Sequence, residues 1–244
     1  MTRRILATSG GFVPGPTQQS VRPGVMLLDA LGRTGASRPR VTFVLTASGD
    51  DRSYAAILFD AFNSVGCDVS ELRLFPQPSA PPSAALSGAD LVWVGGGSVA
   101  NLLALWRLHG VDDALRDAYD SATILAGVSA GSICWHVGGT TDSFGPDLRP
   151  VTNGLGLLAF GNGVHYDSEA QRRPLLHELV AAGTLPTSIA TDDHVGVWYE
   201  DGVPTEVVSD MPLPADGASA YLVESVGGVV RETRLGLGRL GSLG

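Results

Sequence analysis

The segment GVSAG, residues 127–131, has the residue types of a nucleophilic serine site. Ser129 lies between two glycines, directly after an apolar run that ends at residue 128. Small neighbours allow the backbone to turn sharply, which holds a serine hydroxyl exposed between a strand and a helix. The competing interpretation is a helix N-cap, a position where serine is also favoured. Because two glycines flank Ser129, the nucleophile is the favoured interpretation. Ser132 lies one turn into the helix expected to follow, and we expect it to be structural.

A serine hydroxyl is a weak nucleophile at neutral pH, so such a site needs a neighbouring base. Three of the five histidines are poorly placed for this role. His109 ends an expected helix upstream, and His177 belongs to an amphipathic helix on which it is expected to be solvated. His136 follows Ser129 by seven residues on the same expected helix, about 10 Å along its axis, which is too far from the hydroxyl.

His165 and His194 remain as candidate bases. His165 ends the run GLLAFGNGVH, where an expected strand passes through two glycines into a polar loop. His194 follows two carboxylates in the segment ATDDHVGVW. Either His194 is the base itself, or Asp192 or Asp193 orients His165 and holds its tautomer.

The segment VGGGS, residues 94–98, can supply backbone donors for an anion. Three glycines at a strand end, followed by a helix, leave N–H groups free to point at a ligand. A phosphate-binding loop is the competing interpretation, but the segment lacks the lysine of a Walker A motif and the spacing of G-x-G-x-x-G. Together with the N–H of Ala130, one of these glycines can form an oxyanion hole.

The elements that must position these residues alternate along the chain. Helical spacing lies between β-rich apolar runs, which predicts βαβ units and a doubly wound, mostly parallel sheet flanked by helices. Ligands of such sheets bind beyond the carboxyl ends of the strands, where the small-residue loops lie. The expected strands are 4–9, 40–47, 68–75, 90–96 and 122–128, and the helical segments are 21–33, 50–66 and 99–120.

After residue 196 the pattern changes to hairpins. Residues 195–209 read as two strands joined by an Asp-Gly turn, and residues 218–235 read as a second hairpin. Both are expected to add antiparallel strands at the sheet edge. We therefore expect a single domain over 1–244, with a core at 1–196, edge hairpins at 197–235 and a flexible tail at 236–244.

Composition narrows the class of protein further. The 244 residues carry a formal net charge of −9, which argues against a nucleic-acid surface. No stretch reaches the ~18 apolar residues of a membrane helix, and the apolar run after the first residues is too short for a signal peptide. Cys67 and Cys134 are too few for a disulfide framework and are expected to be buried free thiols, so a cytoplasmic protein is expected.

The motifs VGGGS, AGVSAGS, VHYDSE with the following RR, and ATDDHVGVW together resemble the peptidase E family of serine peptidases. This family includes aspartyl dipeptidases and cyanophycinases, and the resemblance runs from about residue 5 to about residue 210. It implies a fold like that of class I glutamine amidotransferases, with a serine in place of their cysteine. By this resemblance Ser129 is the nucleophile, His165 the base and Asp193 the third member, and the oxyanion-hole amides are those of Gly97 and Ala130.

The resemblance also suggests a substrate site. Arg172 and Arg173 follow His165 by seven and eight residues, just before a helix expected to begin at Pro174. A guanidinium suits a carboxylate, although a solvated helix start is an equal interpretation. The expected activity is hydrolysis of short peptides with an N-terminal aspartyl residue, without a metal or organic cofactor, by a monomer or homodimer.

Two alternatives remain open from the sequence. One is another serine hydrolase, either a cyanophycinase-like enzyme acting on β-aspartyl-arginine polymers or an esterase that uses His194 as its base. The other is a catalytically silent binding domain on an amidotransferase-like scaffold.

Overall fold

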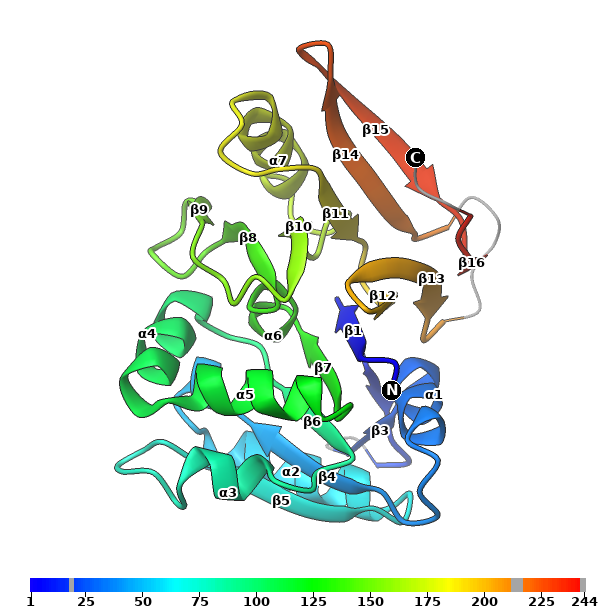
Figure 1. Ribbon diagram of the computed structural model, residues 1–244. Helices are drawn as coiled ribbons and strands as arrows, with labels where there is room; N and C mark the ends of the chain where they lie inside the picture. Colours follow the sequence, from blue (N-terminus) through cyan, green and yellow to red (C-terminus); the bar gives the residue numbers. More distant parts are fainter. Residues whose placement is uncertain (18–19, 212–216, 242–244) are drawn as a thin grey trace.

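The expected strand–helix units form an eight-stranded sheet in the computed structural model (Figure 1). The structure describes residues 1–17, 20–211 and 217–241. Five strands pair in parallel, in the order β1 (Arg4–Thr8), β7 (Ile124–Val128), β6 (Leu91–Val94), β4 (Arg40–Val44) and β5 (Asp68–Leu72). Antiparallel strands continue the sheet beside β1: β12 (Val195–Glu200), β13 (Val203–Ser209) and β16 (Gly238–Arg239).

The predicted fold class is confirmed, but the strands are divided over two sheets, which the sequence did not indicate. The second sheet has the order β9 (Arg149–Val151), β8 (His136–Thr141), β10 (Leu158–Gly163), β11 (Ser188–Thr191), β14 (Ala220–Val226) and β15 (Val229–Leu235). A short hairpin of β2 (Phe12–Pro14) and β3 (Val21–Pro23) follows β1. The link between β11 and β12 passes from the second sheet to the first.

Helices cover both faces of the eight-stranded sheet. One face packs against α1 (Val25–Arg33) and α2 (Arg52–Asn63). The other packs against α3 (Pro82–Leu86), α4 (Val99–His109), α5 (Val111–Asp120) and the short α6 (Ala130–Ile133). A 3₁₀ turn, η1 (Thr46–Ser48), follows β4, and α7 (Arg172–Ala181) packs on the second sheet.

Four helical expectations need correction. In the segment 21–33, residues 21–23 form strand β3, and the helix α1 begins only at Val25. The segment 99–120 is two helices, because Gly110 adopts a left-handed conformation (φ 70°) that ends α4. Helix α7 begins at Arg172 instead of Pro174. His136 lies on strand β8 and not on the helix after Ser129, because α6 ends at Ile133 and the chain continues into a strand that includes Gly138 and Gly139.

The side chains of β6 show how the sheet divides the core. Val92 and Val94 belong to one buried cluster, whereas Leu91 and Trp93 belong to the cluster on the opposite face. Successive strand residues point to opposite faces, so a strand buried on both sides reads as one continuous apolar run. The apolar run at residues 91–94 is therefore the signature of a strand covered on both faces.

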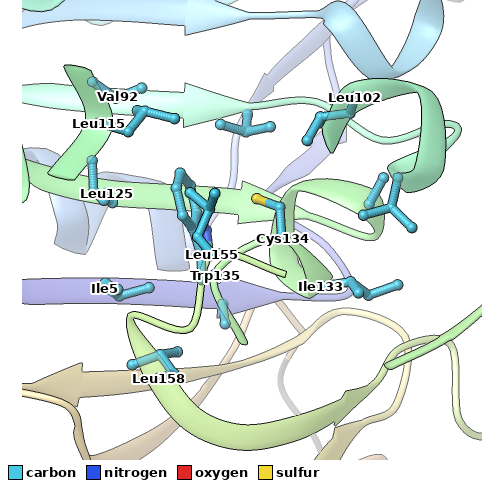
Figure 2. Close-up of a cluster of buried hydrophobic side chains, with 14 of the residues drawn as sticks. Ile5, Val92, Leu102, Leu115, Leu125, Ile133, Cys134, Trp135, Leu155 and Leu158 are labelled. Atoms are coloured by element: carbon cyan, nitrogen blue, oxygen red, sulfur yellow. The ribbon is translucent and has the colours of Figure 1, made fainter. Parts of the chain in front are cut away.

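The segment after Ser129 is anchored in this core. Ile133, Cys134 and Trp135 belong to the same buried cluster as Ile5 of β1 and Leu125 of β7 (Figure 2). Both cysteines are free and buried, as expected, and burial raises the pKa of the Cys134 thiol. These contacts hold α6 firmly against the sheet and thereby set the position of the turn that carries Ser129.

The two C-terminal hairpins form as expected, but on different sheets. The β12–β13 turn uses Asp201 and Gly202, and the β14–β15 turn uses Gly227 and Gly228, all with positive φ, as tight hairpins require. Of the tail expected to be flexible, residues 238–239 pair with β13, and residues 242–244 lie outside the described residues. In the described part of the chain, no helix has the length and apolarity needed to cross a membrane.

Candidate active site

Ser129 occupies a strained turn between β7 and α6. Its backbone has φ 56° and ψ −114°, a conformation that non-glycine residues rarely adopt. A Cβ on Gly127 would lie 2.3 Å from Gly131 O, and a Cβ on Gly131 would lie 2.2 Å from Val94 O, so both neighbours must be glycine. The Ser129 hydroxyl makes no capping hydrogen bond to the helix. Ser129 thus occupies the N-cap position of α6 without capping it through its side chain, and within the described residues its hydroxyl has no hydrogen-bond partner.

His165 lies two residues after β10 and pairs with Asp193. Its Nδ1 lies 2.6 Å from Asp193 Oδ1, and its backbone is also strained, with φ 52°. A carboxylate at Nδ1 holds the proton on that nitrogen and leaves Nε2 as the basic atom. Ser129 and His165 line one pocket, and in the described part of the chain no hydrogen bond joins their side chains.

The two neighbouring carboxylates have different surroundings. Burial opposes the ionisation of Asp193, but hydrogen bonds from His165 and Ser168 outweigh it and lower its pKa. Asp192 is buried, and its Oδ2 accepts hydrogen bonds from the Ser219 amide at 2.8 Å and the Tyr221 hydroxyl at 3.1 Å. Burial is the main cause that raises the pKa of Asp192. The geometry thus joins Asp193, and not Asp192, to His165.

The other histidines lie apart from this pair. His194 is exposed, and it is not among the residues that line the Ser129 pocket. His136 is buried, with Nδ1 2.9 Å from Ser132 O and Nε2 3.3 Å from the Tyr199 hydroxyl, and burial lowers its pKa to about 4. Expected to be solvated, His177 instead pairs with Glu232.

The glycine loop after β6 lies against Ser129. A Cβ on Gly96 would be 3.3 Å from Ser129 Cβ, and a Cβ on Gly97, which has φ 132°, would be 2.3 Å from Ala47 O. Within the described residues, the amides of Gly97 and Ala130 donate no hydrogen bond. Both N–H groups are therefore available beside the serine.

The pocket around Ser129 has a volume of about 260 Å³. A larger pocket of about 590 Å³ beside β13 and β14 contains none of the candidate residues, so size alone does not mark the site. The smaller pocket is lined by the backbone of Gly97 and by polar or charged residues: Ser98, Ser129, Asp142, Ser143, His165, Glu169 and Arg172.

The two adjacent arginines have separate environments. The Arg172 side chain is only 3% exposed, with Nε 2.7 Å from Glu169 Oε2 and Nη1 2.5 Å from Thr140 O. Its Nη2 has no hydrogen-bond partner within the described residues, and the side chain lines the Ser129 pocket. Arg173 instead binds Glu232 and lies over the rings of two tyrosines. Only Arg172 therefore joins the site.

Three pocket residues were missed by the sequence reasoning. Asp142 and Ser143 follow β8, and Glu169 lies in the loop after His165. Asp142 forms no ion pair within the described residues, whereas Glu169 is paired with Arg172. Asp142 and Ser143 carried no sequence signal, because β8 was not predicted. No group of three or more His, Cys, Asp or Glu side chains in the described part of the chain is arranged to hold a metal ion.

Comparisons with known proteins identify the family of this chain and chains of similar fold. The model of peptidase family S51 matches residues 5–207. The uncharacterized peptidase YgaJ of Bacillus subtilis (strain 168) is 36% identical over 223 residues, which cover 91% of this chain and 92% of that protein. A candidate peptidase E protein from Listeria monocytogenes EGD-e has a similar structure, with TM-score 0.58, 17% identity and coverage of 96% of this chain and 100% of that one. A peptidase from an acI-B1 Actinobacterium has TM-score 0.65, 14% identity and coverage of 96% and 94%.

Proposed function

This chain belongs to peptidase family S51 and is a serine peptidase, and we propose that it hydrolyses N-terminal aspartyl (Asp-X) dipeptides with a Ser129–His165–Asp193 triad. One observation carries the proposal. The pocket that holds Ser129 and the Asp193-paired His165 also contains the buried guanidinium of Arg172. A nucleophile, an oriented base and a carboxylate-binding group thus lie in one small cavity.

In the proposed reaction, His165 Nε2 takes the proton from Ser129 as Oγ attacks the scissile carbonyl carbon. The Gly97 and Ala130 amides then donate hydrogen bonds to the oxyanion. His165 then gives its proton to the leaving amine as the C–N bond breaks, which leaves the acyl group on Ser129 Oγ. In the second half of the reaction, His165 takes a proton from a water molecule that attacks the acyl carbon. It returns that proton to Ser129 Oγ as the ester bond breaks. Asp193 stays ionised because its pKa is lowered, so it stabilises the imidazolium that forms on His165.

The side-chain carboxylate of the substrate is assigned to Arg172. Nε and Nη1 are already bonded to Glu169 and Thr140, which orients the guanidinium and leaves Nη2 for the substrate. A charge-assisted hydrogen bond in such a poorly solvated position is stronger than one between neutral groups. Asparagine at this position of the substrate would present an uncharged amide and leave the guanidinium poorly matched.

The free amino group of the substrate is assigned to Asp142. The pocket contains two carboxylates, but Glu169 is already paired with Arg172. Asp142, without an ion pair in the described residues, is the carboxylate available for an ammonium group. Together, Arg172 and Asp142 would recognise the two charges of an N-terminal aspartyl residue.

The test is cleavage of Asp-Leu, Asn-Leu and Ala-Leu by the wild type, Arg172→Met and the neighbouring control Arg173→Met. We expect kcat/KM for Asp-Leu to exceed that for Ala-Leu by roughly 100-fold or more, and Arg172→Met to remove most of this preference. Arg173→Met should retain it, because Arg173 faces Glu232 and two tyrosines. Equal cleavage of Asp-Leu and Ala-Leu by the wild type would refute the substrate assignment.

A further inference from the structure

Ser9, which follows β1, contacts the backbone of the loops that carry His165 and Asp193. It takes no part in the reaction steps proposed above. The residue is 5% exposed, and it does not line the Ser129 pocket. Ser9 Oγ accepts a hydrogen bond from the His165 amide at 3.1 Å. The same oxygen lies 3.1 Å from Thr191 O and 2.7 Å from Thr191 Oγ1, at the end of β11. One buried hydroxyl therefore joins the backbone of His165 to the strand that leads to Asp193.

The backbone of Ser9 holds the other end of the Asp193 loop. Ser9 N donates to Val195 O at 2.8 Å, and Ser9 O accepts from His194 N at 3.0 Å. In the chain, Asp193 lies between Thr191, which contacts the Ser9 hydroxyl, and residues 194–195, which bond to the Ser9 backbone. The residues on both sides of Asp193 are therefore hydrogen-bonded to Ser9.

These contacts coincide with backbone strain. His165 has φ 52° and His194 has φ 64°, and the amide of each donates to Ser9. Strained conformations persist only where the surrounding structure holds them in place. The 2.6 Å contact between His165 and Asp193 depends on both loops, one after β10 and one between β11 and β12.

We propose that Ser9 is a positioning residue that fixes the His165–Asp193 pair by hydrogen bonding to both of the loops that carry it. The inference rests on the proposed triad. Without the Ser9 hydroxyl, the His165 amide loses its hydrogen-bond acceptor. The imidazole is then no longer held in position relative to the Asp193 carboxylate and Ser129. Small displacements of a catalytic group can lower the rate by up to about 100-fold.

The test compares Ser9→Ala with Ser188→Ala. Ser188 is a matched control, because it is also a buried serine whose hydroxyl bonds to a backbone carbonyl, Pro186 O at 2.8 Å, at the opposite end of β11. Three quantities are measured: kcat and KM for Asp-Leu, the rate at which a fluorophosphonate labels Ser129, and the low-field proton NMR signal of His165 Nδ1–H.

For Ser9→Ala we expect kcat and the labelling rate to fall about 10- to 100-fold with KM little changed, and the Nδ1–H signal to shift or broaden. Ser188→Ala should lose some thermal stability but keep all three values. If Ser9→Ala matches Ser188→Ala in rate and in NMR signal, the positioning role is wrong.

The readouts separate this proposal from the proposed function. Labelling of wild-type Ser129 without cleavage of Asp-Leu would reject the substrate, and the labelling rates would still decide the role of Ser9. Absence of labelling in the wild type would reject Ser129 as the nucleophile. The NMR signal of His165 needs no substrate, so it would then decide the role of Ser9.

If Ser9→Ala does not fold, Ser9→Cys replaces it. Sulfur is a weak acceptor, so we expect an intermediate loss. Wild-type rates and an unshifted signal in that variant would overturn the proposal.

Discussion

Replacing Asp193 with asparagine tests the most specific contact of the site. Asp193→Asn keeps the shape of the side chain but removes the negative charge that lies 2.6 Å from His165 Nδ1. An asparagine amide can also donate to Nδ1 through its NH₂ group. The imidazole proton would then lie on Nε2, the nitrogen that must accept the proton of Ser129.

The size of the loss follows from two contributions. A hydrogen bond to a charged group contributes about 1.5–3 kcal/mol, and each 1.36 kcal/mol in the barrier is a factor of ten in rate, so its loss alone lowers kcat roughly 10- to 100-fold. The wrong tautomer removes the base from part of the population. We therefore expect a total loss of about 10²–10⁴ in kcat, with KM little changed.

Asp192→Asn is the matched control. Asp192 is buried, and burial raises its pKa, so its charge is poorly stabilised where it lies. An asparagine oxygen can keep the acceptor contacts with Ser219 and Tyr221, and its NH₂ would replace Asp192 Oδ1, which has no hydrogen-bond partner among the described residues. Steady-state kinetics on Asp-Leu should show a loss below about 10-fold. A large loss in Asp192→Asn with a small one in Asp193→Asn would refute the assignment of the third triad residue.

Acid stability gives a second measurement on the same variant. The pKa of Asp193 is lower in the folded protein than its ordinary value of 3.8, so the folded state binds fewer protons than the unfolded state near that pH. The stabilisation from this carboxylate is complete above the ordinary pKa and is lost as the pH falls through the lowered folded value. The difference in unfolding free energy between wild type and Asp193→Asn should therefore shrink over this interval in denaturant titrations.

Two further predictions concern the nucleophile and the substrate amine. Ser129→Ala and His165→Ala should each abolish turnover in a folded protein, and the double variant should be little worse than either, because triad residues act as a unit; multiplied losses would show that the two residues are not paired. Asp142→Asn should raise KM for Asp-Leu while leaving the fluorophosphonate labelling of Ser129 unchanged, and the wild type should cleave N-acetyl-Asp-Leu poorly. Equal cleavage of the acetylated and free peptides would reject the role of Asp142.

The parts of the site on the parallel sheet could be predicted because local rules specify them. Apolar runs such as residues 91–94 identify strands buried on both faces. A Cβ at residue 127 or 131 would lie 2.3 or 2.2 Å from a backbone oxygen, so both positions require glycine. The sequence shows this requirement directly, as two glycines around Ser129. The turn at Ser129 was therefore recognisable from the sequence.

The second sheet was less predictable, because its central strands are rich in glycine. Strand β8 reads HVGGTT and β10 reads LAFGNG, and glycine is depleted in typical strands. Here the glycines allow close packing: a Cβ on Gly138 would lie 2.1 Å from Val151 O, and one on Gly139 would lie 2.4 Å from Asn162 O. Without β8 the loop that carries Asp142 had no expected position, and the two arginines could not be told apart.

The arrangement of the two sheets explains why the proposed triad needs more than its three side chains. Ser129 follows β7 of the eight-stranded sheet, whereas His165 follows β10 of the other sheet, and Asp193 lies between β11 and β12 on the link between the sheets. Figure 1 shows the arrangement of these strands. Any shift of one sheet against the other would change the distance from the serine to its base. Ser9 is bonded to residues of both sheets, at the point where β1 ends beside β12. In the proposed triad, the distance from Ser129 to His165 is therefore set by the junction between the sheets as well as by the strained turns, and substitutions at this junction should change kcat more than KM.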